Sequence, residues 1–199
     1  DIKKFGKGNY KKIDDTTAGG GPGMILKADV LGPAIDKSLK GCEDKKMPII
    51  YLSPRGKPLT QSKVKKLSKN DGLILLCGRY EGVDQRLLDK YKIEEISLGD
   101  FILAGGEIAA QATLEAIIRL IPGVLGDAES LKNETFNSDL LEFPQYTRPR
   151  KWQNIEIPEV LNSGNHKNID IWRKEMSKKL TKRNRPELWE KYKKKQDIK

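Results

Sequence analysis

The stretch SLGDFILAGGE, residues 97–107, interrupts a short run of strand-forming residues with glycines on both sides. Gly99 precedes the apolar residues 101–103, and Gly105 and Gly106 follow them. Glycines in such places indicate unusual backbone angles or a backbone that must lie close to another group. The stretch therefore predicts a turn at the end of a strand, where the chain passes close to a ligand or to another segment.

Short apolar runs alternate with amphipathic patterns on both sides of this stretch. They predict helices at 28–39, 59–69, 83–91 and 106–121, and strands at 47–54, 72–82 and 93–100. Strands that alternate with helices are typical of an α/β domain with a mostly parallel sheet. Residues 1–18 read as polar and irregular, and GGGPGM (19–24) reads as a loop.

The pattern changes after the last of these helices, and we predict three parts. Residues 1–126 form the α/β domain, and residues 127–157, which carry two prolines in FPQYTRPRK and few periodic apolar positions, form a flexible linker. Residues 158–199 form a small, basic, all-helical domain. From Lys167 to the end, 13 Lys or Arg stand against 5 Asp or Glu in a chain of net charge +10. This excess of positive charge at the end of the chain favours a polyanionic partner over a solvated tail that binds nothing. Nucleic acid is the first candidate and an anionic membrane the second.

The composition excludes several classes of protein. No stretch approaches the roughly 18 apolar residues of a membrane helix, and the first residues lack the apolar core of a signal peptide. Cys42 and Cys77 are expected to be reduced thiols of a cytoplasmic protein. His166 is the only histidine, which excludes a His-rich zinc site, and a Ser-His-Asp triad unless His166 serves it.

Turn residues end three of the predicted strands, at 51–54, 77–82 and 103–106. In open α/β sheets, ligands bind beyond the carboxyl ends of the strands, so these turns are expected to converge on one site. They offer main-chain groups with little side-chain bulk, which suits a flat polar ligand such as a nucleobase. Three ordinary turns are the alternative. Neither the dinucleotide fingerprint G-x-G-x-x-G nor a phosphate-binding P-loop is present.

Seven motifs, in this order, carry a resemblance: GGGPGM, YLSPRGKPL, CGRYEGVDQR, SLGDFILAGGE, IPGVLG, PQYTRPR and SGNH. Together they resemble the bacterial tRNA (guanine-N1)-methyltransferases, of the class of methyltransferases with a knotted α/β core (SPOUT class). The match runs from about Ile13 to Glu187. Compared with that family, the chain is expected to lack a first strand, a helix and a second strand, about 35 residues before Asp1.

The resemblance implies transfer of a methyl group from S-adenosylmethionine to N1 of the guanine just 3′ of the anticodon, position 37 of tRNA. It also implies a cofactor held in a C-terminal trefoil knot, which composition could not have indicated because knots are nearly absent from proteins. The implied cofactor-binding residues are Tyr51, Leu52, Ser53, Pro54, Gly78, Tyr80, Glu81, Leu98, Gly99, Asp100, Phe101, Ile102, Leu103, Gly105 and Gly106.

The same match implies the catalytic residues Arg119 and Glu134. Guanine N1 carries a proton that must leave as the methyl arrives, and negative charge then develops on O6. Arg119 stands where the family has the arginine that stabilises this charge, and an arginine cannot be the base. The family's base is an aspartate before a Ser-Phe pair, whereas this chain has Glu134 before Thr135 and Phe136. Asp127, Glu129 and Asp139 are the alternative bases.

The resemblance further implies a homodimer whose active site lies at the subunit interface. The expected tRNA contacts are Arg148, His166, Arg173, Arg183 and Arg185. Trp172 and Trp189 are expected to pack the helical domain rather than stack on bases. Magnesium is associated with the family's reaction, and Glu81 is the pocket carboxylate expected to approach it.

Two other functions stay open at this stage. One is a ribose 2′-O-methyltransferase of the same fold, against which the linker motif and GGGPGM argue. The other is a weakly active or inactive RNA-binding relative, supported by the expected truncation and by Glu134.

Overall fold

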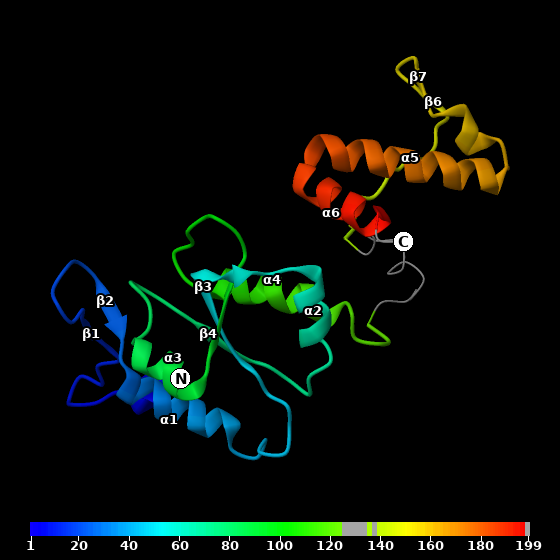
Figure 1. The fold of residues 1–199 in the computed structure, drawn as a ribbon. Coiled ribbons are helices and arrows are strands. Elements are labelled where there is room, and N and C mark those ends of the chain that lie inside the picture. The colour runs from blue at the N-terminus through cyan, green and yellow to red at the C-terminus, as the bar shows by residue number, and fades with distance from the viewer. Residues whose placement is uncertain (125–134, 137–138, 198–199) are drawn as a thin grey trace. The chain divides into compact units, whose positions relative to one another are not determined.

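The computed structural model describes residues 1–124, 135–136 and 139–197, and its contacts divide the chain into two compact units (Figure 1). The first unit is residues 1–125 and the second is residues 126–199. Among the described residues, no helix is long and apolar enough to cross a membrane.

A three-stranded parallel sheet forms the centre of the first unit. Strand β3 (Ile49–Pro58) lies between β4 (Ile74–Cys77) and β5 (Glu94–Ser97), and it is parallel to both. The first residues of β3 are buried without interruption. Such a run is typical of a strand that is covered on both faces. The predicted parallel sheet is therefore confirmed.

Strand β3 extends further than the sequence predicted. Pro54 was expected to end it, but the strand continues to Pro58, and both Leu52 and Lys57 pair with Ile96. The extra residues form an irregularity in the register, where a proline without an N–H is tolerated. Gly56 makes this path possible, because a Cβ there would lie 2.4 Å from the Glu95 carbonyl carbon.

The four predicted helices of this unit are confirmed, with ends that differ by a few residues. They are α1 (Ala28–Leu39), α2 (Gln61–Leu67), α3 (Gln85–Tyr91) and α4 (Glu107–Ile118). Neighbouring residues of β3 point to opposite faces of the sheet. Tyr51 packs in one core cluster with residues of α1 and α3, and Ile50 packs in the other with residues of α2 and α4. Figure 1 shows the helices on the two sides of the strands.

The beginning of the chain is more ordered than predicted. After a 3₁₀ helix at Ile2–Phe5, strands β1 (Asp14–Thr16) and β2 (Met24–Leu26) form an antiparallel hairpin around the predicted GGGPGM loop. Three-residue strands show too little alternation to be recognised in a sequence. The hairpin is connected to the turn that follows β4, because the Glu81 amide donates to the Met24 carbonyl at 3.0 Å.

The second unit contains helices α5 (His166–Asn184) and α6 (Pro186–Asp197), as the pattern after Pro158 predicted. Before them come strands β6 (Lys151–Trp152) and β7 (Ile155–Glu156) and a 3₁₀ helix at Glu159–Asn162. Strands β6 and β7 pair in a short hairpin inside the stretch 127–157, for which only a linker was expected.

An aspartate fixes the start of this unit to its helices. The Asp139 side chain is 7% exposed, its Oδ1 lies 2.5 Å from Lys191 Nζ, and its Oδ2 pairs with Lys195. Nearby, the Leu141 amide donates to the buried Thr181 hydroxyl at 2.8 Å. Burial raises the pKa of Asp139, but the two lysines outweigh it and hold the pKa below its usual value. A carboxylate held in this way is a structural anchor and a poor candidate for the alternative base.

Replacing Asp139 with Asn should lower the free energy of unfolding by about 1–2 kcal/mol at neutral pH, because two charged hydrogen bonds are lost. Since the folded pKa lies below the unfolded one, this stabilisation is present above about pH 4 and is lost as the pH falls further. Thermal unfolding at pH 7 and at pH 3 measures both effects. Asp170→Asn is the control, because that carboxylate is 74% exposed. An equal effect of the two substitutions would contradict the anchoring role.

Candidate functional site

A cavity of about 460 Å³ lies at the carboxyl ends of β3, β4 and β5, where the sequence predicted a site. Of the predicted cofactor-binding residues, the structure brings these together around it: Tyr51, Leu52, Ser53, Pro54, Gly78, Tyr80, Glu81, Leu98, Gly99, Phe101, Ile102, Leu103, Gly105 and Gly106. Asp100 is the exception. It does not line the cavity, and it is exposed in the turn that follows β5.

The glycines after β5 allow a close contact between two segments. The Gly106 amide donates to the Gly78 carbonyl at 2.9 Å. A Cβ on Gly106 would lie 2.9 Å from the Cα of Cys77 and 3.0 Å from the Gly78 nitrogen. The start of α4 therefore lies directly against the end of β4, and this is the close approach that the stretch 97–107 predicted.

Gly78 and Gly82 accommodate the Tyr51 ring. A Cβ on Gly78 would lie 2.7 Å from Tyr51 Cε2. Gly82 has a φ of +124°, which L side chains rarely adopt, and a Cβ there would lie 3.1 Å from the Tyr51 hydroxyl. Burial raises the pKa of Tyr51, so its hydroxyl stays protonated at neutral pH. The cavity thus has an aromatic wall packed against bare backbone.

The sequence reasoning predicted Glu81 but missed two arginines and a glutamine of the cavity lining. Arg55 and Gln85 line it, and Arg55 Nη2 lies 3.0 Å from Glu95 Oε1 and 3.3 Å from Gln85 Oε1. Arg79 also lines the cavity and pairs with Glu107 at 2.9 Å. The pKa of Glu107 lies below its usual value, mainly because of a backbone hydrogen bond and next because of the hydrogen bond from the Arg79 side chain. The signal that could have revealed Arg55 is its position directly after Pro54 in a motif at a strand end.

The structure does not bring the two predicted catalytic residues to this cavity. Arg119 is the half-buried C-cap of α4 and is absent from the cavity lining. Ala109, which lines the cavity, lies ten residues earlier, about 15 Å away along a helix. Glu134 lies outside the described residues, as do the alternatives Asp127 and Glu129.

Metal-binding and thiol chemistry have little support within the described part of the chain. There, no group of three or more His, Cys, Asp or Glu could hold a metal ion, so Glu81 has no such partners. The pKa of Cys77 is raised, mainly by burial and next by the negative charge of Glu107, so Cys77 remains a protonated thiol.

The residues predicted to contact tRNA all lie in the second unit, and all are exposed. Arg173 lies over the Phe143 ring at 4.9 Å, and Arg185 pairs with Glu187. His166 is the first residue of α5. An arginine that stacks on a ring keeps its charge, so these contacts leave the unit basic.

Comparisons with known proteins agree on one family. The family model described as tRNA (Guanine-1)-methyltransferase TrmD matches residues 1–191. A protein of Ruegeria pomeroyi, named tRNA (guanine-N(1)-)-methyltransferase, is 52% identical over 96% of this chain and 79% of its own length. Proteins with the same name from Cereibacter sphaeroides and Caulobacter vibrioides are 54% and 53% identical over 96% of this chain, and over 78% and 76% of their own lengths.

Replacing Gly106 with Ala should weaken the binding of S-adenosylmethionine, the cofactor that the resemblance implies, at least tenfold. The added Cβ would meet backbone atoms at the end of β4, which cannot move without disturbing the cavity. Isothermal titration calorimetry measures the affinity. The control is Gly32→Ala in α1, where the nearest contact is the Tyr91 hydroxyl at 3.3 Å. Unchanged affinity in the Gly106 variant would contradict the close approach.

Proposed function

The chain belongs to the tRNA (guanine-N(1))-methyltransferase family, and we propose that it methylates N1 of the guanine immediately 3′ of the anticodon. The observation that carries this proposal is the convergence of three motifs on one cavity, in a chain that matches the family over residues 1–191. Because tRNAs are made and modified in the bacterial cytoplasm, the protein acts there.

S-adenosylmethionine binds in the cavity at the strand ends. The volume of this cavity, about 460 Å³, lies within the range of about 300–1,000 Å³ that is usual for small-molecule sites. The main-chain groups near Gly78 and Gly106 suit a polar base, and the wall of Tyr51 suits its flat face. The proposal includes the family's trefoil knot, and the close passage of the chain at Gly106 past the end of β4 supports it.

The chemistry assigns separate tasks to two side chains. When bound, S-adenosylmethionine would supply an electrophilic methyl group, which leaves the sulfonium sulfur as its bond to N1 forms, so that S-adenosylhomocysteine is released. Glu134 removes the proton from guanine N1, and Arg119 stabilises the negative charge that develops on O6. An arginine keeps its proton at neutral pH, so the proton must leave through the carboxylate.

A second copy of the chain completes the site. Arg119 lies about 15 Å along α4 from Ala109 in the lining of its own cavity, which favours a role for Arg119 in the cavity of another copy. Helix α4 and the turn before it also expose apolar side chains: Ile102 is 80% exposed, Ile108 61% and Ile118 42%. Such a surface is typical of an interface between copies, which would bring Arg119 of one chain to the cavity of the other.

Magnesium has no evident protein cage in the described part of the chain. Glu81 offers one carboxylate, without two further acidic, His or Cys side chains beside it. No step of the proposed reaction is therefore assigned to a metal.

The proposal is tested by incubating the protein with S-adenosylmethionine and an unmodified tRNA transcript that has guanine after the anticodon. Nucleoside mass spectrometry should detect 1-methylguanosine, and it should detect none with a transcript that has adenine there. A ribose-methylated product would instead support the 2′-O alternative. Absence of any product from a folded sample would support the inactive RNA-binding relative.

In the same assay, Glu134→Gln should reduce the turnover number at least a hundredfold, because general-base catalysis contributes about 10²–10⁴ in rate. Glu134→Asp should retain most of the activity, since it restores the family's carboxylate. The affinity for S-adenosylmethionine should be unchanged in both variants. If Glu134→Gln keeps its turnover number, another group is the base.

Replacing Ile118 with Asp should convert the dimer into monomers and abolish methylation, because a charge would be buried in an apolar interface. Light scattering measures the mass. The control is Ile171→Asp, at a side chain that is 51% exposed on α5 of the second unit. A dimer that survives Ile118→Asp would contradict the assignment of this face.

A further inference from the structure

The hairpin of β6 and β7 was not predicted from the sequence and has no part in the proposed reaction. Lys151 pairs with Glu156, and Trp152 pairs with Ile155. The two turn residues, Gln153 and Asn154, have positive φ values of 46° and 66°, as in the tight turns that join twisted strands. Figure 1 shows the hairpin projecting from the side of α5 opposite to α6.

The hairpin exposes two large apolar side chains. Trp152 is 62% exposed and Ile155 is 65% exposed. The other two tryptophans have ring partners, because Trp172 lies 6.2 Å from Tyr146 and Trp189 lies 5.6 Å from Tyr192. Within the described ranges, Trp152 is the tryptophan without a neighbouring ring. A large aromatic ring left in water on a projecting element is typical of a contact surface.

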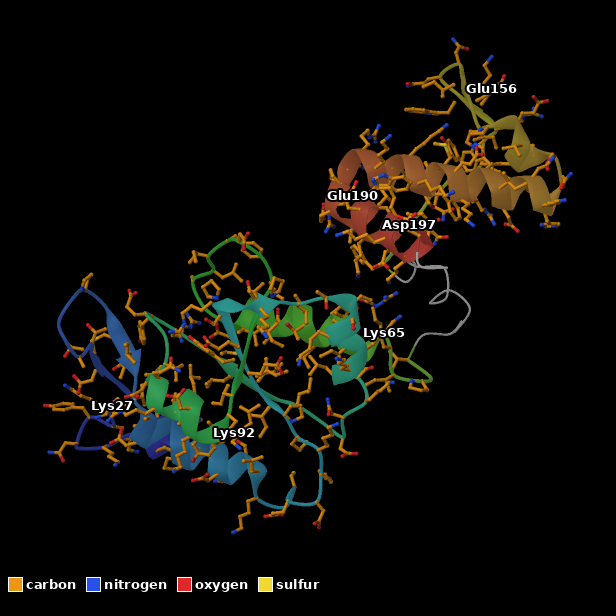
Figure 2. All side chains as sticks on the ribbon, viewed as in Figure 1. Lys27, Lys65, Lys92, Glu156, Glu190 and Asp197 are labelled. Atoms are coloured by element: carbon orange, nitrogen blue, oxygen red, sulfur yellow. The ribbon has the colours of Figure 1, made fainter. Side chains whose placement is uncertain are left out.

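Three positively charged residues lie close to Trp152 in the chain. Arg148 and Arg150 precede β6, and Lys151 is its first residue. All three are exposed, and among the residues that the structure describes none of them forms an ion pair. Figure 2 shows the side chains of the hairpin, with Glu156 labelled, reaching outward from the ribbon. Three cations beside one carboxylate leave the hairpin with a net positive charge.

We propose that the β6–β7 hairpin is a tRNA-contacting element in which an unpaired base stacks on Trp152 while phosphates lie against Arg148, Arg150 and Lys151. The inference rests on the proposed function, since it takes tRNA as the substrate. Aromatic rings flanked by cations are the usual means of holding unpaired nucleotides, because every base has a face that can stack. A second copy of the chain is disfavoured here, since like charges would meet.

Stacking and charge contribute differently, and variants separate them. Trp152→Ala should weaken the binding of an unmodified tRNA transcript by about tenfold to a hundredfold, with an unchanged salt dependence. Trp152→Phe should bind nearly as tightly as the unsubstituted protein, because it keeps a ring. Arg150→Gln combined with Lys151→Gln should reduce the slope of log affinity against log salt by about two. Ile171→Ala is the control for the loss of an exposed apolar side chain in the same unit.

Filter binding at several salt concentrations measures these affinities, and tryptophan fluorescence gives an independent readout. Stacking on Trp152 should quench the emission when tRNA binds, and Trp152→Phe should remove that quenching while affinity persists. A merely structural role of Trp152 would not produce this pair of results. Calorimetry with S-adenosylmethionine should show the same affinity in all variants.

Three outcomes would overturn the inference. One is that Trp152→Ala binds tRNA as tightly as the Ile171→Ala control. Another is that Trp152→Ala changes the mass of the protein in light scattering, which would assign the hairpin to a contact between protein chains. The third is that the unsubstituted protein itself does not bind tRNA, and in that case the proposed function fails together with the inference.

Discussion

The contact between the Gly106 amide and the Gly78 carbonyl is the constraint on which the site depends. It holds the start of α4 against the end of β4, with no room for a methyl group between them. The turn that follows β5 is fixed at one end by the sheet and at the other by this contact, so it can form a wall of the cavity. The same absence of a side chain at Gly78 gives space to the Tyr51 ring. Two glycines on different segments therefore shape one cavity, which is why bulk at either position affects both segments.

The basic charge of the second unit has more than one use. Lys191 and Lys195 hold the buried carboxylate of Asp139 and thereby fix the start of the unit to α6. Arg173 stacks on Phe143, which keeps its charge near the surface. Other cations, those of the β6–β7 hairpin, stand exposed beside an aromatic ring. The net charge alone indicates a polyanionic partner, but the structure separates the cations that stabilise the unit from those that are available to bind.

Much of the first unit could be predicted from the sequence, because its helices are amphipathic and its strands are continuous apolar runs. The extension of β3 could not, since Pro54 reads as a stop and its tolerance depends on the irregular pairing with β5. The hairpins β1–β2 and β6–β7 have strands of two or three residues, which leave no period to detect. Asp100 is a residue of the predicted site whose place in the structure the sequence could not indicate. The family motif gives its position in the chain, but not that its side chain is exposed outside the cavity.

Arg119 and the cavity lining lie at opposite ends of α4. Residues along one helix keep a fixed spacing, so Arg119 at the C-terminal end of α4 stays about 15 Å from Ala109 in the cavity lining. Under the proposed function, residues of a single chain bind the cofactor, and methyl transfer needs a second chain to supply the cation for O6. Cofactor affinity and turnover would then depend on different surfaces. A chain that folds but stays monomeric would bind S-adenosylmethionine without using it, because the charge that develops in the transition state would have no partner.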